Sequence, residues 1–329
     1  MKIFHTNKWL EKDISTINDV IKRGNLGFGP NVTLFEERYA PFSSKQYNTS
    51  TNSASAAAFM IFHYLLERHG QCDVYTTSLG FTSPAWAAKH FGHNLIFVDV
   101  QDDLQFSSEH YRQIRKGSGN KIVVMPVLYG GVSTIKNFNL VGDEIVVVDS
   151  AHCATPTIKS DFVFFSFHTY KPICTSDGGM ISTDIEEADF YFKSYRNFGR
   201  KADGQTYNIV QHGFKFYMNN LNATIGLTQL EHYSRFLQER RSNYDKLKEK
   251  YNLLEHDENS SYYFATTLSD EADSIIEDLK ISRHYPMLHK TNFYQSNKIL
   301  PNLEFLHSKI LNLPLYSYYE KLTDDLCYR

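Results

Sequence analysis

The chain has 329 residues, of which 42% are hydrophobic and 22% are charged, a balance typical of a globular protein and not of a disordered one. This length allows one large core and a smaller second domain. The net charge of −3 gives no electrostatic reason to expect a nucleic acid or an anionic membrane as a partner.

Local composition excludes several other kinds of protein. The first residues, MKIFHTNKWLEKD, lack the apolar core of a secretory signal, and the apolar run near residues 56–66 is too short and too polar to span a membrane. The four cysteines form no CxxC pair, so neither a disulfide framework nor a zinc site is expected. We therefore expect a cytoplasmic protein with no metal site, no membrane partner and no nucleic-acid partner.

The first helices are predicted from apolar periodicity and from the loop residues between them. Residues 9–22 and 32–40 form two helices, separated by the loop GNLGFGP at residues 24–30. A third helix is predicted over residues 54–69, which carry a strongly apolar face and end at Gly70.

Short β-branched segments then alternate with helices. The predicted strands cover residues 74–77, 95–98, 121–127, 144–149, 161–166 and 180–183, and helices are predicted over residues 84–90 and 108–115. This alternation predicts an α/β fold, with a mostly parallel central sheet sandwiched by helices. Ligands of such sheets bind at the carboxyl ends of the strands.

The C-terminal part predicts a second domain. Helices are expected over residues 186–197 and 219–249, with an irregular segment between them. Shorter strand and helix patterns follow, so we place a domain boundary near Tyr251. Residues 1–250 are expected to form a large domain, and residues 251–329 a small C-terminal α/β domain.

An acid and a lysine follow two of the predicted strands. The run EIVVV ends in Asp149, and the run DFVFF leads through Ser166 and His168 to Lys171. Pyridoxal phosphate (PLP) requires such a pair, because the lysine amine forms a Schiff base with it. The carboxylate pairs with the protonated pyridine nitrogen, so that the ring can act as an electron sink. Taken alone, the pair is equally compatible with an ordinary ion pair at a sheet edge.

The phosphate of such a cofactor needs an anion-binding segment. The helix that starts in TNSASA offers small residues, and the backbone amides of Ala54 and Ser55 could approach a phosphate with the aid of the helix dipole. An ordinary helix cap is the alternative interpretation. Ser166 could donate its hydroxyl, and His152 follows shortly after the acid. Phe81 could lie flat over a pyridine ring, although core packing is the favoured explanation of this residue taken alone.

Seven segments, in this order, resemble the motifs of the DegT/DnrJ/StrS nucleotide-sugar aminotransferases. They are GNLGFGPNVTLFEERYA, NSASAAAF, VVDSAHCA, FSFHTYKPICTSDGGMIST, RNFG, GFKFYMNNLNATIGLTQL and HYPMLHK. The resemblance runs from Gly24 to about Leu315 and implies the aspartate aminotransferase fold, which is PLP fold type I.

The resemblance implies a role for each matching residue. Lys171 looks like the Schiff-base lysine, Asp149 like the partner of the pyridine nitrogen, and Phe81 like the stacking aromatic. The implied phosphate anchors are Ser166 and the backbone at Ala54 and Ser55, and His152 occupies the position beside the ring. The matching segments also contain the residues that we expect to face the substrate: Phe28, Tyr217, His284, Tyr285 and His289.

The chain departs from the family pattern at three positions. Ala54 stands where the family has Thr, which removes a hydroxyl from the phosphate site. Lys215 stands where Asn is frequent, on a loop that in the family reaches the phosphate of the partner subunit. Tyr217 stands where Arg is frequent. The resemblance therefore implies a homodimer with two shared sites, in which Lys215 could offset the missing hydroxyl.

The implied activity is a transamination. L-Glutamate would give its amino group to PLP, and the keto group of a nucleotide-diphosphate sugar, most commonly a 4-keto-6-deoxyhexose, would receive it. The amino sugar would serve surface polysaccharide, glycan or natural-product biosynthesis. One alternative is a PLP-dependent sugar dehydratase, in which His replaces the lysine, and Lys171 argues against it. Another is a non-catalytic relative that binds PLP or a sugar.

Overall fold

The computed structural model describes residues 10–117, 119–201, 207–279, 283, 285–294, 296 and 298–315. Its centre is a seven-stranded sheet with the order β1-β7-β6-β5-β4-β2-β3. The strands are β1 (Tyr47–Thr51), β2 (Cys72–Thr77), β3 (Asn94–Val98), β4 (Lys121–Met125), β5 (Ile145–Asp149), β6 (Phe162–Ser166) and β7 (Gly179–Thr183). Only β7 runs antiparallel to its neighbours, so the predicted mostly parallel sheet is confirmed.

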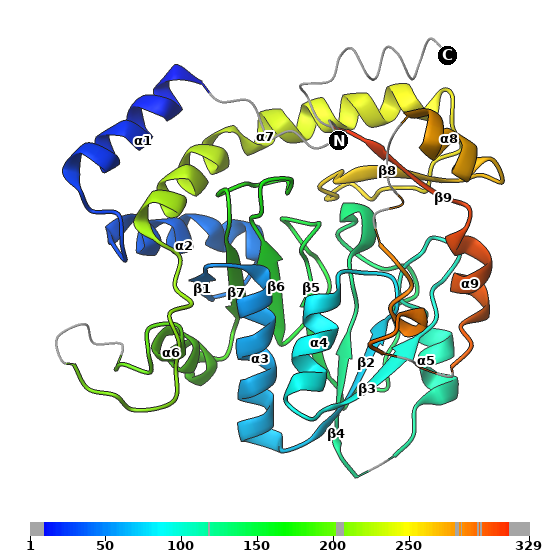
Figure 1. The fold of residues 1–329 in the computed structure, drawn as a ribbon, viewed down its shortest axis with the longest axis horizontal. Helices are drawn as coiled ribbons and strands as arrows, with labels where there is room; N and C mark the ends of the chain where they lie inside the picture. The colour runs from blue at the N-terminus through cyan, green and yellow to red at the C-terminus, as the bar shows by residue number, and fades with distance from the viewer. Residues whose placement is uncertain are drawn as a thin grey trace.

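Helices cover both faces of this sheet (Figure 1). Buried side chains of α2 (Pro30–Ser43), α5 (Ser108–Ile114) and α7 (Asn220–Lys248) pack on one face. Those of α3 (Ala54–His69), α4 (Thr82–His90) and α6 (Glu186–Tyr195) pack on the other. The strands between the two layers are buried on both sides, which explains why their sequences are continuous apolar runs. The predicted fold class is therefore correct.

The structure contains one strand that the sequence patterns did not predict. β1 has the sequence YNTST, which lacks both an apolar run and a clear alternation. Its pairing with β7 at the edge of the sheet buries four of its five residues. Tertiary contacts therefore decide the conformation of this polar segment.

A second, two-stranded antiparallel sheet consists of β8 (Phe264–Leu268) and β9 (Ile310–Pro314), and α8 (Ala272–Leu279) and α9 (Pro301–His307) lie between these strands in the sequence. The helix α7 runs across the top of the view from the side of α1 (Glu11–Arg23) to this small sheet (Figure 1). The two sheets lie on either side of Tyr251 in the sequence. We propose that they mark the two expected domains, residues 1–250 and residues 251–329.

The described part of the chain contains no helix that is both long and apolar enough to cross a membrane. Within the same residues, no group of His, Cys, Asp and Glu side chains is arranged to hold a metal ion.

Candidate active site

The strand register brings the predicted polar groups to one edge of the sheet. Asp149 at the end of β5 pairs with Phe164 of β6, two residues before Ser166. Strand spacing and rise then place the backbones of Asp149 and Ser166 roughly 8 Å apart. In the other direction, Ser166 pairs with Gly179 of β7, and Gly179 pairs with Thr51 of β1. The carboxylate, the serine and the start of α3 therefore lie along one line at the sheet edge.

Gly179 permits the close approach of the start of α3. A Cβ atom at this position would lie 2.5 Å from the carbonyl carbon of Ser53 and 2.6 Å from the nitrogen of Ala54. Any side chain would therefore push the N-terminus of α3 away from Ser166. The second glycine of the SDGGM motif thus has a steric role in shaping the anion-binding segment.

These groups surround a cavity of about 460 Å³, a size suited to a cofactor or a small substrate. Eight of the residues expected at the site line it: Ala54, Ser55, Phe81, Asp149, His152, Ser166, Lys171 and Tyr285. The ring of Phe81 is 62% exposed, so it is not a core residue and is available to cover a flat ligand.

Lys171 lies in the loop between β6 and β7, which is closed by its own backbone bonds. The Phe167 N–H donates to the Gly178 carbonyl at 2.9 Å, and the Lys171 N–H donates to the His168 carbonyl at 2.8 Å. The Lys171 side chain enters the cavity, where burial lowers its pKa to about 8, partly opposed by the nearby Asp149 carboxylate. A larger share of this amine than usual is therefore unprotonated at neutral pH.

Asp149 is buried, with 4% of its surface exposed, and lines the same cavity. Burial raises its pKa to about 6, although the Ala151 N–H bond to Oδ1 at 3.0 Å and the charge of Lys171 both favour the carboxylate. A cation placed against Asp149 would favour the ionised form further. The site is therefore suited to hold a positively charged ring nitrogen.

His152 lies on the side of the cavity that is formed by tyrosines from the C-terminal part of the chain. Its Nε2 lies 2.8 Å from the Tyr285 hydroxyl, and its ring stacks on that of Tyr263 with centroids 4.4 Å apart. Tyr263 also contacts Lys171, since the lysine Nζ lies 3.4 Å from the tyrosine hydroxyl oxygen. The segment SSYYF gave no motif signal for Tyr263, which our sequence analysis missed.

The N-terminus of α3 provides donors for an anion. The Ser53 side chain caps the helix by accepting the Ala56 N–H at 3.1 Å, while the amides of the first turn have no partner within the helix. The Ser55 hydroxyl bonds to that of Ser83, in the first turn of α4, at 2.8 Å. Ser83 also lines the cavity and could supply a hydroxyl that Ala54 lacks. Ser83 precedes Pro84, and proline is common in the first turn of a helix. This pattern could have predicted that Ser83 lies at a helix N-terminus.

Several expected residues lie outside this cavity in their own chain. Phe28 and Tyr217 contact each other edge to face, with centroids 5.4 Å apart, and the Lys215 Nζ lies 5.7 Å from the Tyr217 ring. His289 is fully buried between Ser78 and Glu304. The roles proposed for these four residues remain predictions, and His284 lies outside the described residues.

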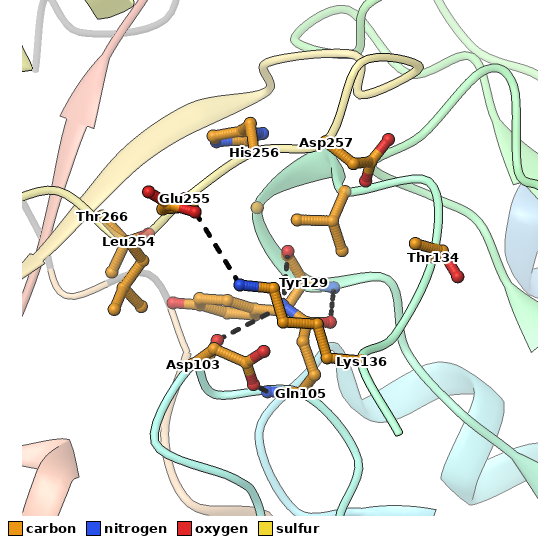
Figure 2. Close-up of a pocket in the computed structure, with 12 residues that line it drawn as sticks. Asp103, Gln105, Tyr129, Thr134, Lys136, Leu254, Glu255, His256, Asp257 and Thr266 are labelled. Carbon is orange, nitrogen blue, oxygen red and sulfur yellow. Dashed lines mark hydrogen bonds and ion pairs between the residues drawn. The ribbon is translucent and has the colours of Figure 1, made fainter. Parts of the chain in front are cut away.

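A second cavity, of about 160 Å³, lies where the loop around Gln105 and the turn η1 (Tyr129–Gly131) meet residues 254–257 and Thr266. Figure 2 shows Gln105 beside Tyr129, with Lys136 directed toward Glu255 across the gap. The Gln105 side chain donates to the Tyr129 carbonyl at 3.0 Å and accepts its N–H at 3.2 Å. Neither Lys171 nor Asp149 lines this cavity, so we do not assign it to the active site.

The first cavity fits PLP in chemistry and in shape. It offers a lysine amine of lowered pKa for the cofactor aldehyde and a buried carboxylate for the ring nitrogen. Phe81 can cover one ring face, and the start of α3, close to Ser166, suits the phosphate. The fold and this site define a PLP-dependent transferase of fold type I.

The chain belongs to the DegT/DnrJ/EryC1/StrS aminotransferase family, whose sequence profile matches residues 8–325. It is therefore a PLP-dependent aminotransferase. A UDP-4-amino-4,6-dideoxy-N-acetyl-beta-L-altrosamine transaminase of Campylobacter jejuni is 26% identical over 96% of this chain and 85% of the relative.

Solved structures share the fold. The PLP form of the putative sugar aminotransferase Spr1654 from Streptococcus pneumoniae has a TM-score of 0.86 and 22% identity, covering 99% of this chain and 96% of that one. DesI, solved in the presence of its TDP-sugar product, has a TM-score of 0.83 and 20% identity, covering 100% of this chain and 91% of that one.

Proposed function

We propose that the protein transfers an amino group from L-glutamate to the keto group of a nucleotide-diphosphate sugar of the 4-keto-6-deoxyhexose type. The observation that carries this proposal is that Lys171 and Asp149 line the same cavity, beside the start of α3. The names of the relatives support a nucleotide-linked sugar, since one acts on a UDP-sugar and another was solved with a TDP-sugar product. The amino sugar would serve polysaccharide, glycan or natural-product biosynthesis.

In this proposal Lys171 moves the proton. When bound, PLP withdraws electrons from the carbon that carries the amino group. The Lys171 amine would take the proton from that carbon and return it on the other side of the nitrogen, at the cofactor carbon that had carried the aldehyde. Lys171 would thus act as general base and then as general acid. Its lowered pKa suits both tasks near neutral pH.

The other residues of the cavity hold and orient the reactants. The Asp149 carboxylate keeps the opposing ring nitrogen protonated, which stabilises the negative charge that develops when the proton leaves. Phe81 covers the ring, and the Ser166 hydroxyl with the Ala54 and Ser55 amides would hold the phosphate. Tyr285 is the expected substrate-facing residue that lines the cavity, and it would meet the sugar.

We further propose that the active protein is a homodimer in which each subunit completes the other's site. Lys215 is exposed and lies beside Tyr217, which contacts Phe28. Large apolar side chains are exposed nearby: Phe28 is 45% exposed, Phe198 is 38% exposed and Phe214 is 51% exposed. Such a group of exposed rings supports a subunit contact. A two-fold arrangement would carry each Lys215 to the partner's phosphate.

Complementation tests this arrangement. Lys171→Ala and Lys215→Glu should each be nearly inactive, but mixing and refolding them together should restore about a quarter of the wild-type sites. The reason is that a mixed dimer has one site with both changes and one site with neither. Activity is measured on the whole refolded mixture, and the mixed dimer isolated by differential tagging should be active at half of its sites.

The matched control for Lys215→Glu is Lys246→Glu, an exposed lysine near the end of α7, which should remain active alone. An inactive mixed dimer would show that Lys215 does not serve the partner's site.

The sugar dehydratase alternative requires a histidine where this chain has Lys171, so we do not favour it. The non-catalytic alternative is compatible with the altered phosphate turn at Ala54. Both differ from the proposal in product, because neither yields an amino sugar.

The proposal is tested in two steps. Borohydride reduction of the PLP-loaded protein, followed by peptide mapping, should place a pyridoxyl label on Lys171. A panel of nucleotide keto-sugars is then incubated with L-glutamate, and mass spectrometry should detect an amino sugar together with 2-oxoglutarate. A label on another lysine would refute the assignment of Lys171. A labelled protein that aminates none of the sugars would favour the non-catalytic alternative.

A further inference from the structure

We propose that Tyr263 is a positioning residue for Lys171. Its ring and hydroxyl hold the lysine amine in the cavity whenever that amine is not bound to the cofactor. This inference rests on the proposed aminotransferase function and adds a residue from the small-domain side of the site.

The contacts of the Tyr263 side chain connect the two groups. The Lys171 Nζ lies 3.4 Å from the Tyr263 hydroxyl oxygen and 4.5 Å from the centroid of its ring. The imidazole of His152 stacks on the same ring at 4.4 Å, with an interplanar angle of 27°. Tyr263 is 3% exposed, so these contacts are made away from bulk water, where they are strongest.

The backbone holds Tyr263 firmly in this place. Its N–H donates to the Gly130 carbonyl at 3.0 Å, and the Ser261 N–H donates to the Gly131 carbonyl at 2.7 Å. Gly131 has φ +94°, and a Cβ atom there would lie 2.8 Å from both the His152 carbonyl oxygen and the Tyr263 nitrogen. Only glycine permits this close approach of His152 and Tyr263.

The preceding residue, Tyr262, is in an unfavourable conformation. Its φ of +47° is rare for a bulky side chain and is tolerated only where the surroundings impose it. The ring of Tyr262 stacks on His256 at 4.6 Å, away from the cavity, while Tyr263 is directed into it. The turn therefore separates a packing tyrosine from a tyrosine of the site.

These contacts suit a lysine that must carry a proton. The hydroxyl oxygen and the ring face of Tyr263 stabilise the ammonium form of Lys171, and the hydroxyl can donate to the neutral amine. A lysine side chain has four flexible carbons, and without such a partner it would sample positions away from the reacting carbon. Tyr263 therefore limits the amine to one region in both protonation states.

The test compares Tyr263→Phe with Tyr262→Phe, a loss of the same hydroxyl one residue away. The pH dependence of Lys171 acetylation by acetic anhydride is measured in cofactor-free protein by peptide mass spectrometry. Tyr263→Phe should lower the pKa of Lys171 by about 0.5, because the oxygen that accepts from the ammonium is lost. Tyr262→Phe should leave the acetylation profile at the wild-type position.

A second measurement uses PLP-loaded protein. The single-turnover rate with L-glutamate should fall roughly tenfold in Tyr263→Phe, while the dissociation constant of PLP stays within about twofold of wild type. Tyr262→Phe should change neither. Equal acetylation profiles for the two variants, or a loss in Tyr263→Phe confined to PLP affinity or thermal stability, would assign Tyr263 a packing role and overturn the proposal.

The acetylation measurement requires neither PLP nor a sugar, so its outcome is independent of the proposed function. Conversely, the absence of a borohydride-fixed label on Lys171 would refute the proposed function whatever the acetylation profile shows.

Discussion

Replacing Lys171 by alanine should lower the rate of transamination by about 10²- to 10⁴-fold, because general acid and base catalysis at the transferred proton is lost. PLP should still bind through the Asp149 carboxylate, Phe81 and the start of α3, but its absorbance should be that of the free aldehyde. The rate is measured with saturating L-glutamate and the keto-sugar identified by the screen.

The fold should survive this substitution. The loop of Lys171 is held by backbone bonds, including the Lys171 N–H to the His168 carbonyl and the Thr175 N–H to the Phe167 carbonyl, both at 2.8 Å. Alanine keeps these bonds, so the melting temperature should change by only a few degrees.

Lys159→Ala, which removes an exposed lysine from the same domain, is the matched control and should retain full activity. Methylamine added to Lys171→Ala should restore part of the rate, because a small amine can enter the space that the side chain vacates. A Lys171→Ala protein that retains more than about one hundredth of the wild-type rate would show that another base carries the proton.

Much of the fold and of the site could be predicted because both depend on local patterns. Strands buried on two faces require continuous β-branched runs, so EIVVV and DFVFF were recognisable, and their ends placed Asp149 and Ser166 at one edge. The start of α3 was recognisable from its small residues. These signals lie within a few residues of the groups that they identify.

The residues that escaped prediction depend on distant contacts. Tyr263 reaches Lys171 across 92 residues of sequence, and its position is set by Gly130 and Gly131, which lie in another part of the chain. The segment SSYYF contains no periodicity or motif that predicts this contact. β1 escaped for a similar reason, because its polar residues form a strand only when β7 lies beside them.

Some of the predicted site residues do not line the cavity of the chain that carries them. Lys215, Phe28 and Tyr217 lie together outside the cavity of their own subunit. A motif identifies such residues but does not say which subunit's site they serve. The complementation experiment addresses this point, since it depends on whether two lesions fall in one site or in two.

Asp149→Asn should leave PLP bound but lower turnover by about 10²- to 10³-fold, because a neutral amide does not keep the opposing ring nitrogen protonated. The asparagine Oδ1 can still accept the Ala151 N–H, so the local geometry should be preserved.

Near-wild-type turnover of Asp149→Asn would show that another acid faces the ring. Asp177, which also lines the cavity, would then be tested. The exposed Asp143 provides the matched control, and Asp143→Asn should be as active as wild type.

The same substitution should have the opposite effect on the stability of the cofactor-free protein. Burial raises the pKa of Asp149 from 3.8 to about 6, so the folded chain binds this proton more tightly than the unfolded chain does. The free energy of unfolding of the wild type should therefore fall as the pH rises from about 4 to about 6, and the loss should persist at neutral pH. Asparagine carries no such proton, so Asp149→Asn should lack this pH dependence. At pH 7 the variant should be more stable than the wild type by about 3 kcal/mol.

Urea unfolding of the two cofactor-free proteins at pH 4.5 and at pH 7 measures this difference. A variant that loses both activity and stability at pH 7 would indicate that Asp149 mainly supports the fold. A variant that loses activity and gains stability would show that the carboxylate is kept in the cavity at the expense of the fold, as expected for a group whose partner is the cofactor.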